Sequence, residues 1–273
     1  MKLKDYVTLG NLLGGFAAVI ALFAGSFDWA CYFIYIAYVF DVLDGPVARL
    51  TKQYDTFGGV FDEVCDYITN SVMASFVVFY AFWKNAGYPM ALAAVIAAFP
   101  LTLGSLRQAR SMDKPLSYPC YWLGLPRPVL ALFVLSVLNS SWFNIKSEPL
   151  NVIAPASVAV AIIVGSFFHL SKIPFPNHQK RRFMGPMWFG RLWFLGGSPI
   201  LFAVCIALGH TRWVYDYLTF SFVMYVFVSW TQIPPQDKRR IRHYIATGEL
   251  ENPLVHKDNT WRPSGWVPAL SKE

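Results

Sequence analysis

Long apolar segments constrain the fold of this chain more than any other feature of its sequence. A membrane-spanning helix needs about 20 consecutive, mostly apolar residues. Only 14% of the 273 residues are charged, and the mean hydropathy is +0.40, whereas about 25% of residues are charged in soluble domains. The sequence therefore predicts an all-α polytopic membrane protein with about eight transmembrane helices. The predicted spans cover residues 12–26, 29–47, 58–83, 87–105, 128–143, 150–170, 193–210 and 213–231.

The basic residues predict how these helices are oriented. With both termini in the cytoplasm, every Lys and Arg except Lys84, Lys146 and Arg212 falls in a cytoplasmic segment, as the positive-inside rule requires. We therefore expect a multi-pass protein of the cell (inner) membrane. The net charge of +7 then reflects topology and contact with anionic lipid headgroups. Nucleic-acid binding is not expected, because no soluble domain is present to carry a basic face.

The chain divides into a membrane-embedded domain, residues 1–231, and a basic cytoplasmic tail, residues 232–273. The tail begins with Ile233-Pro-Pro-Gln-Asp-Lys-Arg-Arg-Ile-Arg-His, which predicts a short interfacial helix resting on anionic lipid. The four cysteines are scattered without a CxxC pair, so neither a zinc site nor a disulfide framework is expected. The five histidines form no ligand cluster, and we interpret them as ordinary interfacial or loop residues.

An acidic cluster interrupts the apolar sequence between Asp41 and Asp66. Six of the 16 acidic residues fall in this stretch, although a carboxylate inside a membrane is costly and is rarely present without a function. Asp41 and Asp44 are three residues apart, and Asp62 and Asp66 are four apart, so each pair can line one face of its helix. The Gly-Pro pair after Asp44 is expected to end or kink the second span. The second and third spans then become antiparallel neighbours, with both acidic pairs near the cytoplasmic end.

The residue types in this stretch indicate phosphoryl transfer on a lipid-soluble substrate. Four carboxylates at one point repel each other, and their oxygen ligands suit Mg²⁺ or Mn²⁺ rather than Zn²⁺. Enough carboxylates are present for two ions, an arrangement that clamps phosphoryl oxygens. Gly45, Ala48 and Gly58 leave space for a ligand close to the backbone. Arg49 offers a planar fork for phosphate.

Other interpretations of the acidic cluster stay open. A single intramembrane aspartate could be structural and paired with Arg49 or Lys52, but all four at this spacing are harder to explain in that way. A cation transporter or channel is the non-enzyme alternative, since acidic rings also line cation paths. Against it, the acids gather at one face instead of following a pore. A regulatory or scaffold protein with a decayed site is a third alternative.

The whole stretch matches the pattern D-x-x-D-G-x-x-A-R-x8-G-x3-D-x3-D. The matching residues are Asp41, Asp44, Gly45, Ala48, Arg49, Gly58, Asp62 and Asp66. This pattern resembles the signature of the CDP-alcohol phosphatidyltransferases. The resemblance implies a six-helix core, here followed by two C-terminal spans, with two divalent metal ions and a CDP-linked lipid bound beneath the cytoplasmic surface. It also implies that an alcohol attacks the β-phosphoryl group and releases CMP.

The same resemblance implies roles for individual residues. Asp66 would contact the second metal ion and act as general base on the incoming hydroxyl. The metal ligands would be Asp41, Asp44, Asp62 and Asp66. The contacts to the CDP moiety would come from Asn11, Gly45, Ala48, Arg49 and Gly58. Homodimerisation is implied by the resemblance alone.

The acceptor alcohol is suggested by shorter motifs. Thr8-Leu-Gly-Asn11, Leu106-Arg-Gln-Ala-Arg110, Gly124-Leu-Pro-Arg-Pro128 and Ser171-Lys-Ile-Pro-Phe-Pro176 resemble stretches in the members of the family that use serine. Transfer of the phosphatidyl group from CDP-diacylglycerol to L-serine is therefore the expected reaction.

Side-chain chemistry leaves the acceptor partly open. Arg107 and Arg110 could hold the serine carboxylate, although both could be simple cytoplasmic anchors. The sequence after Asp66 resembles that of choline-using enzymes, and choline favours an aromatic box. Candidates for such a box are Tyr67, Tyr118, Tyr121 and Trp122, which could equally belong to the interfacial aromatic belt. Choline, inositol phosphate and glycerol phosphate stay as alternatives to L-serine.

Overall fold

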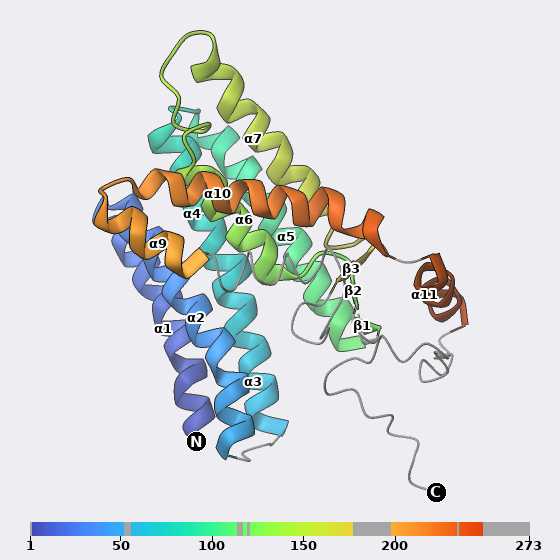
Figure 1. Cartoon of the computed structure of the whole chain (residues 1–273). Coiled ribbons are helices and arrows are strands. Elements are labelled where there is room, and N and C mark those ends of the chain that lie inside the picture. The colour runs from blue at the N-terminus through green and yellow to red at the C-terminus, as the bar shows by residue number, and fades with distance from the viewer. Residues whose placement is uncertain are drawn as a thin grey trace, which may run out of the picture.

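The structure is a computed structural model that describes residues 2–51, 56–113, 117–118, 121–176, 198–233 and 235–247 (Figure 1). Most of these residues are helical. The first two helices are α1 (Leu3–Phe23) and α2 (Phe27–Thr51). A continuous helical segment follows, made of α3 (Thr56–Tyr67), η1 (Ile68–Met73), α4 (Ala74–Tyr80) and η2 (Ala81–Asn85), where η1 and η2 are π-helical. The remaining core helices are α5 (Met90–Asp113), α6 (Arg127–Asn139) and α7 (Leu150–Phe167).

Five helical segments of the described residues are long and apolar enough to cross a membrane. They are Leu3–Phe23, Phe27–Ala48, Phe57–Asn85, Met90–Met112 and Leu150–Phe167. These segments confirm the multi-pass membrane fold and correspond to five of the predicted spans, although the first begins at Leu3 instead of residue 12 and the fourth continues to Met112 instead of residue 105. The predicted span at 128–143 corresponds to α6, which is apolar but shorter, and every side chain from Leu130 to Asn139 is buried. This helix therefore lies at the centre of the bundle.

The last two predicted spans correspond to helices that are not among these five long apolar segments. The first contains α9 (Ser198–Ala207), and residues 193–197 of that predicted span lie outside the described residues. The second contains α10 (Thr211–Val223), which continues through η4 (Met224–Val228) and η5 (Ser229–Gln232). In Figure 1, α10 runs across the bundle, and it packs against α6. The count of eight spans stays a prediction.

Small residues allow α1 and α2 to pack closely. A Cβ atom at Gly14 would lie 2.9 Å from the Cβ atom of Ala37 and 3.1 Å from its Cα atom. Membrane helices use such small residues to bring backbones together. The α1–α2 contact fixes the amino-terminal helix beside the helix that carries Asp41 and Asp44.

The second helix does not end at the Gly-Pro pair after Asp44. It continues through Pro46 to Thr51, so the expectation that the span could end there is wrong. Proline removes one backbone N–H and one helical hydrogen bond, but membrane helices tolerate it because neighbouring groups compensate. Ala48 and the backbone of Arg49 are consequently helical.

A small antiparallel sheet was not predicted. It consists of β1 (Ser117–Tyr118), β2 (Tyr121–Leu123) and β3 (Pro174–Pro176), in that order. Tyr121 pairs with Pro176, and Leu123 pairs with Pro174. The sheet therefore fastens the connection between α5 and α6 to the segment that follows α7.

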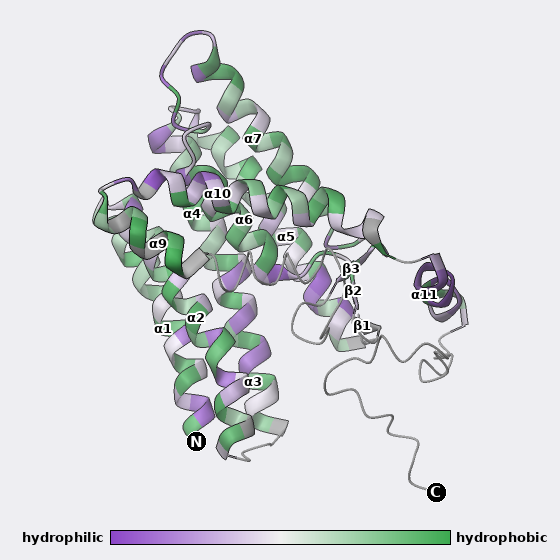
Figure 2. Cartoon of the chain, viewed as in Figure 1, coloured by the Kyte–Doolittle hydropathy of each residue, from purple (hydrophilic) through white to green (hydrophobic). Residues whose placement is uncertain are grey.

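The predicted tail helix is present as α11 (Pro235–Thr247). It packs on β2 through a small cluster of Tyr121, Leu123, Ile233 and Ile241. In Figure 2, α11 is largely hydrophilic, whereas α7 is largely hydrophobic. Residues 248–273 of the predicted tail lie outside the described residues.

Candidate active site

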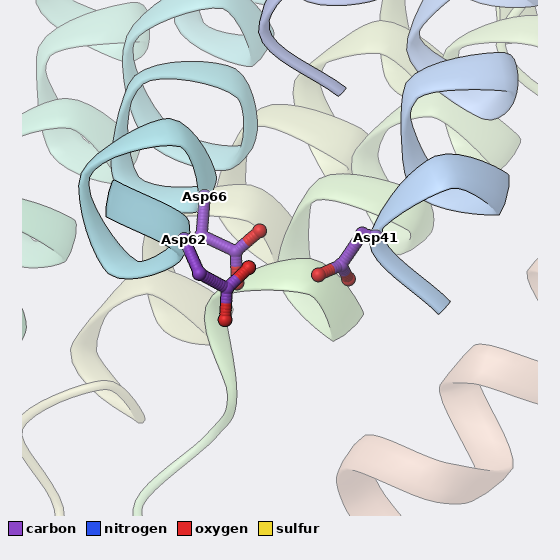
Figure 3. A group of neighbouring side chains, drawn as sticks. All are labelled: Asp41, Asp62 and Asp66. Carbon is purple, nitrogen blue, oxygen red and sulfur yellow. The ribbon is translucent and has the colours of Figure 1, made fainter. Parts of the chain in front are cut away.

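Three of the predicted aspartates converge at one point. Asp41 comes from α2, and Asp62 and Asp66 come from successive turns of α3 (Figure 3). One carboxylate oxygen of each lies within 4.8 Å of the corresponding oxygens of the other two. All three side chains are half-buried. The i, i+4 spacing on α3 faces both carboxylates toward α2, as the sequence predicted.

The fourth aspartate lies beside this group. Asp44 is buried, and its carboxylate accepts a hydrogen bond of 3.0 Å from the Thr8 hydroxyl of α1. The carboxyl group of Asp44 is also within hydrogen-bonding distance of Asp62. In the same way, the carboxyl group of Asp41 is within hydrogen-bonding distance of Asp66. The four acids thus form two contacting pairs, each with one member from α2 and one from α3.

This arrangement fits a divalent cation. Adjacent carboxylates repel each other unless they share a proton or a cation. The Oδ1 atom of Asp62 is buried and has no hydrogen-bond partner among the described residues, so it retains a lone pair for a ligand. A set of carboxylate oxygens matches the preference of Mg²⁺ and Mn²⁺. The residues that would hold such ions are Asp41, Asp44, Asp62 and Asp66.

Asn11 orients one member of the cluster. Its side-chain amide donates a hydrogen bond of 2.9 Å to Oδ1 of Asp66, and the Asn11 side chain is fully buried. Sequence reasoning predicted Asn11 as a CDP contact and did not predict this bond. In the structure, α1 therefore supplies a group that holds a carboxylate of α3.

Two basic residues that were not predicted as site residues act on the cluster. Arg127 begins α6, and its guanidinium interacts electrostatically with Asp66, Asp41 and Asp62. It also donates a hydrogen bond to the side-chain carbonyl of Gln108. Lys4 of α1 interacts electrostatically with Asp62. The position of Arg127, between two prolines at the start of an apolar helix, could have indicated a site residue from the sequence. The sequence around Lys4 contains no comparable signal.

The residues predicted to contact CDP lie about one helical turn from the acids. Ala48 follows Asp44 by one turn of α2 and is buried, and Gly58 precedes Asp62 by one turn of α3 and is also buried. Gly45 is half-buried. Arg49 belongs to α2 by its backbone, and its side chain lies outside what the structure describes. Their contacts with a nucleotide stay a prediction.

The three residues predicted to bind the acceptor are engaged elsewhere. Nη1 of Arg107 donates to the carbonyls of Leu123 and His169, at 2.9 and 3.1 Å. Nη1 of Arg110 donates to the carbonyl of Leu170 at 2.7 Å. The Tyr67 hydroxyl is 2.8 Å from the Ser105 hydroxyl. The structure does not bring these side chains into the carboxylate group, and their acceptor role stays a prediction.

His169 is not an ordinary loop residue, which corrects the sequence interpretation. Its ring is buried, and Nδ1 donates to the Leu125 carbonyl at 2.7 Å. Burial lowers the pKa of His169 to about 3, so the ring is neutral at physiological pH. Together with Arg107, it joins the end of α7 to the start of α6.

Comparison with known proteins identifies the family of this chain. The sequence model of the CDP-alcohol phosphatidyltransferase family matches residues 1–170, which is more than half of the chain and includes the whole carboxylate cluster. This chain belongs to that family.

Several relatives in the CDP-alcohol phosphatidyltransferase family carry names that mention serine. The chain is 29% identical over 184 residues to the CDP-diacylglycerol–serine O-phosphatidyltransferase of Methanocaldococcus jannaschii, covering 67% of this chain and 78% of that protein. It is 26% identical over 177 residues to the protein of the same name from Helicobacter pylori, covering 63% and 71%. An archaetidylserine synthase of Methanothermobacter thermautotrophicus is 26% identical over 179 residues, covering 65% and 70%. The chain is therefore a CDP-alcohol phosphatidyltransferase.

Proposed function

We propose that this phosphatidyltransferase transfers the phosphatidyl group of CDP-diacylglycerol to L-serine, giving phosphatidylserine and CMP in phospholipid biosynthesis. The observation that carries the chemistry is the convergence of Asp41, Asp62 and Asp66 within 4.8 Å. The choice of serine is supported by the names of the relatives. Choline, inositol phosphate or glycerol phosphate would use the same chemistry.

The proposed reaction is an in-line displacement at phosphorus. Asp66 accepts the proton of the serine hydroxyl while the serine oxygen attacks the β-phosphorus. The bond between that phosphorus and the oxygen bridging to CMP breaks, and CMP leaves with the bridging oxygen. Asn11 keeps the Asp66 carboxylate oriented through its hydrogen bond of 2.9 Å, which provides the positioning that general-base catalysis needs.

Other residues of the chain bind and orient the substrates in this proposal. Asp41, Asp44, Asp62 and Asp66 would hold two divalent ions, Mg²⁺ or Mn²⁺, which neutralise diphosphate charge when bound. Arg127 adds a fixed positive charge beside the general base, where it favours anionic substrate groups. The CDP moiety would contact Asn11, Gly45, Ala48, Arg49 and Gly58. The acceptor would be bound with help from Arg107, Arg110 and Tyr67.

We also propose an orientation in the membrane and an oligomeric state for the enzyme. The site and both termini face the cytoplasm of a cell (inner) membrane, and residues 1–231 form the catalytic domain of a homodimer. The distribution of basic residues supports the orientation. A soluble nucleotide product such as CMP also leaves most readily toward the cytoplasm.

The deciding experiment measures CMP release by the purified full-length protein. CDP-diacylglycerol and Mg²⁺ or Mn²⁺ are supplied, and L-serine, choline, inositol phosphate and glycerol 3-phosphate are added separately. CMP release with L-serine supports the proposal. CMP release only with another alcohol would make that alcohol the acceptor instead of serine. A cation transporter would release no CMP with any of them.

Asp66→Asn should lower the rate by about 10²- to 10⁴-fold while CDP-diacylglycerol still binds. Asp28→Asn is the matched control, because Asp28 lies in the first turn of α2, far along the helix from Asp41. An equal loss in both variants would contradict the role proposed for Asp66.

A further inference from the structure

The tail helix α11 has two chemically different faces. Ile241 is 1% exposed and Asp237 is 6% exposed, and these residues are four apart on one side of the helix. Tyr244 and Ile245 pack on the same side. Arg239 lies on the opposite side, Arg242 lies about 100° around the helix from Ile241, and both are exposed. Five of the thirteen residues of α11 are basic, namely Lys238, Arg239, Arg240, Arg242 and His243.

The buried face of α11 is fixed to the sheet. The hydroxyl of Tyr121 donates a hydrogen bond to the Asp237 carboxylate, and both residues are buried. Tyr121 lies in β2, the middle strand. Ile241 fills the apolar cluster beside Tyr121 and Leu123. The helix is therefore held in one orientation, and its arginine-bearing side faces away from the sheet.

The attachment point of α11 comes just after the end of the α5 membrane segment at Met112 and is close to the active site. The strand β2 lies between the end of α5 at Asp113 and the start of α6 at Arg127. Arg127 acts on the carboxylates of the site, and Leu123 of β2 accepts the hydrogen bond of Arg107. The end of the bundle that carries α11 is thus also the end that carries the acids. Phospholipid headgroups surround a membrane protein at such an end.

We propose that the outward face of α11 is a binding surface for anionic phospholipid headgroups of the surrounding bilayer. A basic amphipathic helix next to a membrane gains both electrostatic and interfacial energy from anionic lipid. Here the apolar side is already satisfied by the sheet, so the outward contact is electrostatic and depends on headgroup charge and on salt. The proposal does not rest on the identity of the acceptor alcohol.

The test places a reporter on the outward face of α11. Ala246 is exposed. It lies one turn after Arg242 in α11, next to the last residue of the helix. The full-length Ala246→Cys protein is labelled with an environment-sensitive fluorophore, after a parallel labelling of the parent protein has measured the background from native cysteines. The protein is then placed in nanodiscs of phosphatidylcholine alone, or of phosphatidylcholine with one-third phosphatidylglycerol.

The expected result is a fluorescence shift with phosphatidylglycerol that high salt reverses. Each arginine at an anionic surface contributes about fivefold to binding, so Arg239→Gln with Arg242→Gln should reduce the response by more than fivefold. Arg212→Gln is the matched control, because Arg212 is an exposed arginine of α10 outside the proposed surface.

Three outcomes would overturn the proposal. The fluorophore could respond equally in neutral and anionic discs, or the double variant could keep the full response. RNA could also produce the shift in neutral discs while anionic lipid does not, which would assign the surface to nucleic acid. Size-exclusion profiles and CMP release of each variant verify that the bundle stays folded, so a lost response is not a folding defect.

Discussion

Asn11 of α1 donates a hydrogen bond of 2.9 Å to the carboxylate of Asp66 on α3. The two residues are 55 positions apart in the chain. The Asp66 carboxyl group is also within hydrogen-bonding distance of Asp41 of α2, so three helices define the position of one carboxylate. Through this bond, Asn11 holds the Asp66 carboxylate in position.

Replacing Asn11, which both orients Asp66 and is proposed to contact CDP, should slow the reaction more than it weakens CDP-diacylglycerol binding. A hydrogen bond to a charged group contributes about 1.5–3 kcal/mol, so Asn11→Ala should reduce kcat about 10- to 100-fold with a small change in KM for the lipid. Asn139→Ala is the control, because Asn139 is also buried but bonds to Cys31 and Leu135. A raised KM with unchanged kcat would show instead that Asn11 acts mainly on the nucleotide.

Removing one carboxylate should weaken metal activation. Chelation by EDTA should abolish CMP release, and Mg²⁺ or Mn²⁺ should restore it. In Asp62→Asn, the metal concentration for half-maximal rate should rise at least about tenfold, since a charged oxygen ligand is lost. Glu63→Gln is the control, because Glu63 accepts a hydrogen bond from Ser111 and lies outside the carboxylate group. Equal activation curves for parent and Asp62→Asn would contradict the metal site.

Arg127 should have opposite effects on cations and anions. Its positive charge disfavours a nearby metal ion and favours anionic substrate groups. Arg127→Gln should therefore lower the metal concentration for half-maximal rate and raise KM for CDP-diacylglycerol or serine, each by about threefold to tenfold, whereas Arg127→Lys should keep both near the parent values. Steady-state kinetics over a metal series measures both. A shift of the two constants in the same direction would exclude this electrostatic role.

Gly124 should tolerate no side chain. Its φ is +77°, and a Cβ atom would lie 2.7 Å from Nη1 of Arg107 and 2.8 Å from the carbonyl of His169. Gly124→Ala should destabilise the protein by about 3 kcal/mol, from backbone strain and overpacking together. Gly87→Ala is a matched control, since Gly87 has φ +71° but no atom within 4 Å of a Cβ. Thermal unfolding in detergent should show a clearly smaller loss for Gly87→Ala.

The buried His169 should make the protein sensitive to acid. The folded-state pKa of His169 is about 3, well below the value of about 6.5 for an unfolded histidine. The unfolded chain therefore binds the extra proton first, and stability falls by up to about 1.4 kcal/mol per pH unit as pH decreases from about 6 toward 4. His169→Asn can still donate to Leu125 but does not titrate. The parent should lose more stability than His169→Asn over this range, and parallel losses would contradict the assignment.

The sequence predicted those features of the fold and the site that depend on the spacing of nearby residues. Apolar windows identified five helices long enough to span, and the spacing of Asp62 and Asp66 placed both on one face of α3 because a helix repeats every 3.6 residues. The helix does not end at the Gly-Pro pair, since α2 continues through Pro46 to Thr51, whereas a kink there stays a prediction. The sheet was missed because strands of two or three residues are too short to show an alternating pattern.

The partners of the site residues depend on contacts between distant segments. Arg127 reaches the acids from the start of α6, and Thr8 reaches Asp44 from α1. A single sequence contains no spacing rule for such pairs. The same limit applies to Arg107, whose charge suggested an anionic substrate but whose observed partners are the carbonyls of Leu123 and His169.

The pairing of Tyr121–Leu123 with Pro174–Pro176 has a consequence for biosynthesis. A nascent chain carries all four aspartates once α3 has left the ribosome. The strand β2, however, has no β3 to pair with until residue 176 has been made, and the His169 carbonyl that accepts from Arg107 is equally absent. The enzyme is therefore expected to become competent late in translation, after α7 has entered the bilayer.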